Sequence, residues 1–426
     1  MMTSSKQYTE GYVWIWLPGE IKPVIAGRLE ADGDTLSFNY GKSYLERIKD
    51  TPKAIPIYEP ELPLKPGAIP NLEGLTMPGC IRDSAPDAWG RRVIINKKLG
   101  SKGADTDTAV LDELTYLLES GSDRIGALDF QESPTEYVPR SAKNASIEEL
   151  MESVDRVEKG VPLTPELDLA LYHGSSIGGA RPKALIEDNN TKYIAKFSAT
   201  NDLYSVVKAE FIAMRLAELA GIDVASVKMV KAAKKDVVLI ERFDRVKTAT
   251  KNSGVDWARR SMVSALTLFE LDDMLARYAS YEVLAEIIRH RFIQPKDTLK
   301  ELFSRLVFNI LCGNNDDHAR NHAAFWDGKH LSLTPAYDIC PQGRTGNVQG
   351  QAMKILGDNN ASQFKTCLAA AQNFLLSKEE AYGIFEHQKS VIEQNWQSVC
   401  DEAELSVVDR RLFWNRQFLN PYSVEE

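Results

Sequence analysis

A polar cluster in the second half of the chain has the residue types and spacing of a phosphotransfer site. Residues 313–322 read GNNDDHARNH, and Asp316 and Asn321 are five positions apart. Catalytic loops of phosphotransferases use this D-x-x-x-x-N spacing, in which the aspartate accepts a hydroxyl proton and the asparagine holds Mg²⁺. Both residue types are also common in ordinary turns, so the spacing alone is a weak signal.

An apolar helix is predicted directly before this cluster. Its large apolar side chains recur at steps of three and four residues, which places them on one helical face: Leu299, Leu302, Phe303, Leu306, Val307, Ile310 and Leu311. Gly313 is a plausible left-handed stop for this helix. Packing behind the helix would hold the polar residues at its end in place, as a catalytic loop requires.

A hairpin is predicted directly after the cluster. Two short apolar stretches, 323–326 and 330–333, flank Asp327-Gly328, a strong hairpin signal. If these two residues form the turn, Trp326 opposes Lys329 and Asp338 returns to the level of Asp317. A third acidic group then lies beside Asp316 and Asn321, and such a set of hard oxygen ligands suits Mg²⁺.

The composition is that of a globular protein. The 426 residues are 43% hydrophobic and 26% charged, which predicts two or three domains. The formal charge of −9 argues against binding nucleic acid by surface charge alone, although binding through a partner stays open. The five cysteines form no C-x-x-C pair, and no apolar run suits a signal peptide or a membrane span, so we expect reduced thiols and a cytoplasmic location.

A glycine-rich stretch upstream could bind phosphate. Residues 174–183 read GSSIGGARPK, in which small residues would let backbone amides approach an anion and a lysine ends the loop. The candidate nucleotide-binding residues there are Ser176, Ile177, Gly178, Gly179, Ala180 and Lys183. The alternative is an ordinary hairpin turn, and neither the Walker nor the dinucleotide pattern is present.

Further candidates follow this loop. Lys196 interrupts the apolar strand 193–197, as the lysine that grips nucleotide phosphates in kinases does, or it is a solvent-facing strand lysine. Glu210, or else Glu218, on a predicted helix at 206–219 could pair with it. The buried strand 237–240 then leads into ERFDR at 241–245, where a kinase hinge would offer backbone groups to adenine, unless this is an ordinary charged strand end.

The order of these parts predicts an α+β protein with a two-lobed, kinase-like fold. Residues 1–150 form a β-rich amino-terminal module, residues 151–245 a nucleotide-binding lobe, and residues 246–426 a helical lobe that carries the catalytic loop. Helical periodicity in the last lobe covers 261–269, 281–292, 299–312, 364–375, 378–396 and 407–418.

Several linked motifs resemble the HipA family of serine/threonine kinases, the toxin half of bacterial toxin–antitoxin pairs. They occur in order along nearly the whole chain: RDSAPDAWGR at 82–91, RIGAL at 124–128, the loop at 176–183, ERFDR at 241–245, DDHARN at 316–321 and PAYD at 335–338. Ordinary protein-kinase motifs are absent, since no His-Arg-Asp precedes the loop and no Asp-Phe-Gly follows it.

The resemblance implies ATP and Mg²⁺ as cofactors and gives each residue a role. Lys196 would position ATP phosphates, and Asp316 would deprotonate the acceptor hydroxyl. Asn321 and Asp338 would bind Mg²⁺. The adenine-side and remaining cofactor contacts would be Glu241, Phe243, Asp244 and His318. The resemblance also implies autophosphorylation of Ser176, or of Ser175 beside it, in the glycine-rich loop.

The resemblance further implies a helix-turn-helix antitoxin like HipB as partner, with DNA bound only through that complex. The protein substrate would belong to translation, such as an aminoacyl-tRNA synthetase, but no residue selects one. Two other functions remain open: a small-molecule phosphotransferase of the aminoglycoside type, and a non-catalytic antitoxin-binding co-regulator of transcription. A zinc pair of His318 and His322 is disfavoured because oxygen ligands dominate the cluster. Asp317, His318 and His322 are interpreted mainly as supports of the loop.

Overall fold

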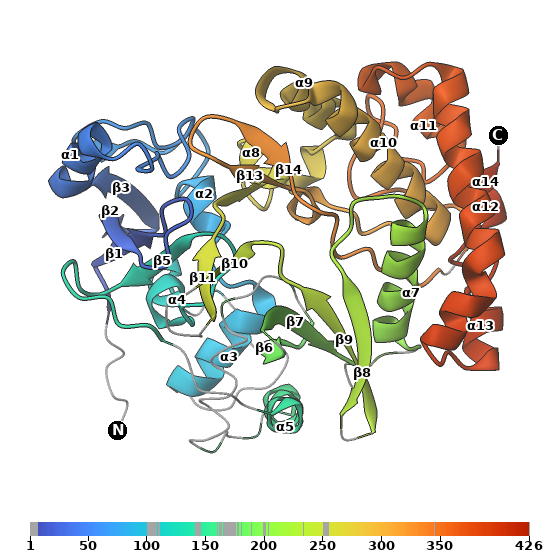
Figure 1. Cartoon of the computed structure of the whole chain (residues 1–426), viewed down its shortest axis with the longest axis horizontal. Coiled ribbons are helices and arrows are strands. Elements are labelled where there is room, and N and C mark those ends of the chain that lie inside the picture. The colour runs from blue at the N-terminus through green and yellow to red at the C-terminus, as the bar shows by residue number, and fades with distance from the viewer. Residues whose placement is uncertain are drawn as a thin grey trace. The chain divides into compact units, whose positions relative to one another are not determined.

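A computed structural model of the chain describes residues 7–99, 109, 111–140, 146–159, 161, 164, 176, 179, 181–188, 190–198, 202, 204–232, 234–249, 255–344 and 346–425. The chain divides into two compact units (Figure 1). Unit 1 comprises Met1–Thr200, Arg242–Val263 and Phe325–Lys329, and unit 2 comprises Asn201–Glu241, Ser264–Ala324 and His330–Glu426.

Unit 1 is built on an antiparallel sheet with the strand order β4-β3-β2-β1-β5. Alternating burial along β3 shows why it forms, since every second side chain enters the core. The strands are β1 (Glu10–Ile15), β2 (Val24–Asp32), β3 (Thr35–Tyr40), β4 (Ala68–Ile69) and β5 (Leu128–Gln131). The predicted β-rich amino-terminal module is confirmed.

The described part of unit 1 also contains five helices and two further hairpins. The helices are α1 (Lys42–Asp50), α2 (Gly79–Arg82), α3 (Ala88–Leu99), α4 (Glu113–Glu119) and α5 (Ile147–Glu158). The hairpins join β6 (Lys183–Asp188) to β7 (Thr191–Phe197), and β10 (Arg245–Ala249) to β11 (Val255–Arg259). The β10–β11 hairpin was not predicted, because its strands alternate apolar and charged residues and Val246 is exposed.

Unit 2 is mainly helical, and its described residues include the hairpin of β8 (Val227–Ala232) and β9 (Lys235–Glu241). The 25-residue α12 packs along both α7 and α10 (Figure 1). The helices are α7 (Val206–Leu219), α8 (Ala265–Leu268), α9 (Tyr281–Arg291), α10 (Pro295–Cys312), α11 (Phe364–Ala370), α12 (Lys378–Glu402), α13 (Val407–Phe413) and α14 (Pro421–Val424), with 3₁₀ turns η2 (Ala276–Tyr278), η3 (Ala319–Asn321) and η4 (Ala371–Phe374).

Most predicted helices of this half are confirmed, but the one at 261–269 is wrong in its first part. There the chain forms β12 (Met262–Ser264), and Ser264 then caps the short α8 through its side chain. The residues are apolar in either case, and a short apolar run does not separate a strand from a helix by its period. None of the described helices is both long and apolar enough to cross a membrane.

Candidate functional site

The polar loop begins where α10 ends, on a glycine that the backbone requires. Gly313 has φ +73°, and a Cβ atom there would lie 2.6 Å from the carbonyl oxygen of Gln417. Directly behind it, the Asn314 side-chain amide donates to Asn309 Oδ1 at 3.0 Å, and the Asn314 backbone N–H donates to the Asn309 carbonyl at 2.8 Å. The helix end is therefore a rigid base for the residues that follow, as predicted.

Asp317 points into the core and anchors the loop. Its carboxylate accepts a hydrogen bond from the Tyr281 hydroxyl and lies 3.1 Å from His322 Nε2. Asp317 and His322 are each 3% exposed, and the Tyr281 ring meets the His322 ring edge-on. The interpretation of Asp317 and His322 as supports of the loop is confirmed.

Asp316, the neighbouring acid, is an exposed residue, although protein atoms surround part of its carboxyl group. Partial burial of its carboxyl group raises its pKa; the positive charge of His318 lowers it, and the negative charge of Asp338 raises it. The structure thus brings Asp338 and His318 within electrostatic reach of Asp316, as a shared site requires.

Asn321 completes this group of polar residues. It is buried, and its amide nitrogen donates to the backbone carbonyl of Asp316 at 3.2 Å. The donor half of the carboxamide is engaged in this way, which leaves Oδ1 as an acceptor. Asp338 adopts a left-handed backbone conformation, with φ +59°, which is unusual for a residue other than glycine and common at functional sites.

The hairpin that returns the chain toward Asp338 has a different register from the predicted one. The strands are β13 (Ala323–Trp326) and β14 (Leu331–Leu333), and Thr334 N–H donates to the Ala323 carbonyl at 3.1 Å. The predicted partner of Ala323 was Ser332, so the register is wrong by two residues. The turn is longer because Asp327 Oδ1 accepts from Lys329 N–H at 2.8 Å. A shift of two leaves each strand side chain on its original face, but Asp338 lies beyond β14, so its approach to Asp316 depends on the segment that follows the strand.

Arg305 fixes the segment before Asp338, and sequence reasoning missed it. Its guanidinium donates to the carbonyl oxygens of Thr334 at 2.8 Å and Asp223 at 3.2 Å, and its Nε lies 2.8 Å from Glu301. Arg305 is 3% exposed. The available signal was a charged residue within the apolar face of a buried helix.

The phosphate-binding candidates lie in unit 1. Lys183 and Lys196 are directly opposite each other in the β6–β7 hairpin, and they are 5% and 8% exposed. Ser176 and Gly179 are described, and Ser176 is 2% exposed. Ser175, Ile177, Gly178 and Ala180 lie outside the described residues.

Residues 242–245 of the ERFDR segment are held by a buried network of charges in unit 1. The Asp244 carboxylate accepts from Arg242 at 2.7 Å, from Arg245 at 2.8 Å and from the Gly126 backbone N–H at 2.8 Å. Asp123 in turn accepts from Arg245 at 2.7 Å. Burial acts to raise the pKa of Asp244, but the two arginines and the Gly126 N–H outweigh it and hold the pKa at about 2.

Glu241 and Phe243, the other two residues of this segment, have different surroundings. Glu241 is exposed, whereas Phe243 is half-buried and meets the Phe325 ring edge-on at 5.9 Å between centroids. Of the two proposed partners for Lys196, Glu210 is 2% exposed, whereas Glu218 is exposed and paired with Arg215 on its own helix. The pairing of Lys196 with either residue stays a prediction.

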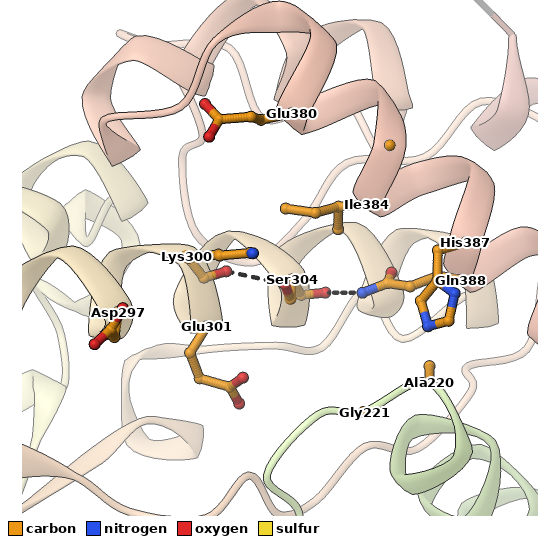
Figure 2. Close-up of a pocket in the computed structure, with 11 residues that line it drawn as sticks. Ala220, Gly221, Asp297, Lys300, Glu301, Ser304, Glu380, Ile384, His387 and Gln388 are labelled. Carbon is orange, nitrogen blue, oxygen red and sulfur yellow. Dashed lines mark hydrogen bonds between the residues drawn. The ribbon is translucent and has the colours of Figure 1, made fainter.

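A separate hollow of about 460 Å³ lies in unit 2 between the first half of α10 and α12 (Figure 2). Some of its lining residues are bonded to one another: the Gln388 side-chain amide donates to the Ser304 carbonyl at 2.9 Å, and the Ser304 hydroxyl donates to the Lys300 carbonyl at 2.9 Å. None of the predicted site residues lines it. It is therefore not the predicted catalytic site.

Comparisons with known proteins match both halves of the chain to one family. The model of the HipA-like C-terminal domain matches residues 175–396, and that of the HipA N-terminal domain matches residues 17–131. The chain belongs to the HipA family. This confirms the resemblance found in the sequence.

Curated relatives of this HipA-family chain are distant. It is 25% identical over 275 residues to protein Y4mE of Sinorhizobium fredii, which covers 58% of the chain and 60% of the relative. It is 25% identical over 187 residues to the serine/threonine-protein kinase toxin HipA of Shewanella oneidensis, covering 38% and 42% of the two proteins. The matches therefore span about half the length of these relatives.

A solved structure gives a much longer match to the fold. A chain of the Shewanella oneidensis MR-1 complex of HipA, HipB and operator DNA covers 94% of this chain and 93% of its own length, with 20% identity and a TM-score of 0.67. This likeness confirms the predicted α+β fold of the HipA type, with its amino-terminal β-sheet module.

Proposed function

We propose that this HipA-family chain is an ATP- and Mg²⁺-dependent serine/threonine protein kinase. The observation that carries the proposal is the grouping of Asp316, Asn321 and Asp338 at the rigid end of α10. Phosphoryl transfer needs little covalent chemistry from the protein, so positioned carboxylates and a carboxamide are sufficient catalytic groups.

Asp316 is the base in this mechanism. Its exposed carboxylate orients the acceptor hydroxyl and receives its proton, and its raised pKa makes it a better proton acceptor than an ordinary aspartate. Asn321 Oδ1 and the Asp338 carboxylate would hold Mg²⁺, which neutralises charge on the transferred phosphoryl group. The oxygen-only donor set fits this ion. We assign His318 to tuning the charge of Asp316 and contacting the nucleotide.

Residues upstream of the catalytic loop would bind the nucleotide. Lys196 and Lys183 provide the cations for its phosphates, and the glycine-rich loop provides backbone amides; Ser176 or Ser175 there is the proposed autophosphorylation site. Glu241 and Phe243 would lie on the adenine side. Asp244 has every carboxylate contact directed to neighbouring protein groups, so we assign it to holding this segment in place.

The proposed partner is a HipB-like helix-turn-helix antitoxin. The support comes from the solved relative, which lies in a complex with HipB and operator DNA. The formal charge of −9 fits DNA contact through the partner rather than through this chain. The proposed substrate is a protein of translation, which rests on the family resemblance.

Incubation of the purified chain with γ-labelled ATP and Mg²⁺ tests the proposal. We expect label on serine or threonine of protein, either the chain itself or an added cell extract, and none with Asp316→Asn. Label only in small-molecule products would favour the aminoglycoside-type alternative. No transfer by the parent chain, with tight antitoxin binding retained, would favour the non-catalytic regulator.

A further inference from the structure

Asp87, directly before α3, and Trp89, in the first turn of α3, hold one arm of the glycine-rich loop through three hydrogen bonds. Asp87 Oδ2 accepts from the Gly179 backbone N–H at 2.6 Å, and the Trp89 backbone N–H donates to the Gly179 carbonyl at 3.3 Å. The Trp89 indole Nε1 donates to the Lys183 carbonyl at 3.1 Å. These contacts join residues 90 to 94 positions apart, all within unit 1.

The first turn of α3 is itself held in place by contacts within unit 1. Arg91 Nε donates to the Pro86 carbonyl at 2.9 Å, and its guanidinium forms a paired contact with Glu113 of α4 at 2.6 and 2.7 Å. The same guanidinium stacks 4.5 Å from the centre of the Tyr116 ring. The Trp89 side chain is completely buried. Asp87 and Trp89 are thus fixed before they meet the loop, and a preorganised contact loses little entropy when a ligand binds.

The contacts are made to Gly179 and Lys183, two of the residues proposed to bind the nucleotide's phosphates. Gly179 has φ +103°, a conformation that only glycine adopts easily, so its amide direction depends on outside support. The Lys183 ammonium group lies against Gly179, where a Cβ atom would collide with it. Lys183 in turn is paired with Lys196 across the β6–β7 hairpin. Any movement of Gly179 would therefore displace the Lys183 ammonium group, which lies beside it.

We propose that Asp87 and Trp89 are positioning residues for nucleotide binding, which hold Gly179 and Lys183 in the geometry that receives ATP phosphates. The inference rests on the proposed kinase function. It gives the amino-terminal module a direct part in the site: the RDSAPDAWGR motif acts through the backbone of the glycine-rich loop and touches no reacting atom.

Equilibrium binding of MgATP and steady-state kinetics, measured on the full chain, test this inference. We expect Asp87→Ala to raise the dissociation constant and the KM for ATP about tenfold, with kcat changed less than threefold. Asp87→Asn keeps an acceptor oxygen for Gly179 N–H and should stay within threefold of the parent. Glu46→Ala, at an exposed site on α1, is the matched control and should have no effect.

Trp89→Phe provides a second test that does not depend on the folding of Asp87→Ala. It keeps an aromatic ring and removes the indole donor together with part of the buried ring, so we expect a three- to fivefold loss of MgATP affinity. Hydrogen exchange should show faster exchange across 176–183 in Asp87→Ala. Faster exchange with unchanged ATP affinity, or an equal loss in Asp87→Asn and Asp87→Ala, would overturn the inference. A parent chain that binds no MgATP would instead refute the proposed function, and the positioning role with it.

Discussion

At the residue scale, the candidate site contains two adjacent aspartates with opposite environments. Asp316 is exposed and has a raised pKa, whereas Asp317 is 3% exposed and bonded to Tyr281 and His322. The sequence pattern predicted Asp316 as the catalytic member of this pair. It could not reveal Tyr281, because that tyrosine lies 36 positions upstream and carries no local signal.

Stability measurements should separate the two aspartates. Asp317→Ala leaves the Tyr281 hydroxyl and the His322 ring without their buried acceptor, so we expect the free energy of unfolding to fall by about 2–4 kcal/mol. Asp316→Asn, the control, changes an exposed side chain and should cost less than about 0.5 kcal/mol. Chemical unfolding monitored by fluorescence gives both values, and equal losses would contradict the assignment of Asp317 as the anchor.

The pH dependence of catalysis follows from the raised pKa of Asp316. The proposed base acts as a carboxylate, so kcat/KM should fall as the pH is lowered through a pKa above the ordinary aspartate value. His318 lowers that pKa through its positive charge, so His318→Gln should move the acid limb to higher pH. A pH–rate profile of the two proteins measures this, and a shift to lower pH would show that His318 does not act on Asp316.

At the element scale, the apolar periodicity and the Asp-Gly pair predicted α10 and the hairpin, but they did not predict the register of the hairpin. The spacing of apolar residues from Leu299 to Leu311 is a strong helical signal, and the helix ends at the predicted glycine. The turn of the hairpin was misjudged because an Asp-Gly pair is compatible with turns of different lengths, and the contact from Asp327 to Lys329 N–H is visible only in three dimensions.

The buried network around Asp244 holds neighbouring segments of unit 1 together, so its mutation should lower the free energy of unfolding. Asp244→Asn removes the charge that compensates Arg242 and Arg245, so we expect a loss of about 3–5 kcal/mol at pH 7. Asp34→Asn, at an exposed turn position, is the matched control and should be neutral.

This loss should also depend on pH. The pKa of Asp244 is depressed to about 2 in the folded chain, so its stabilisation is complete above the unfolded pKa near 4 and disappears as the pH falls toward 2. The difference between the parent and Asp244→Asn should therefore shrink over that range. A difference that grows as the pH falls would contradict the depressed pKa.

At the scale of the whole molecule, the order of motifs predicted the fold class better than it predicted the contacts between distant residues. The α+β class and the HipA family follow from motifs spread along the chain, and both are confirmed. The bond from Asp87 to Gly179 joins two motifs that were each recognised, but no residue pattern indicates that they meet. Such contacts depend on how helices and strands pack together, and the local periodicity of apolar residues does not predict that packing.

In the proposed mechanism Asp316 accepts the proton of the acceptor hydroxyl, while Asp338 helps to hold the nucleotide's metal. Side-by-side measurement of MgATP binding and of labelled phosphate transfer in the parent, Asp316→Asn and Asp338→Asn tests it most directly. We expect Asp316→Asn to bind MgATP within about threefold of the parent and to lose transfer by at least about 100-fold, the lower range for removal of a general base. Asp338→Asn should lose both transfer and MgATP affinity. Full transfer activity in either variant would contradict the account.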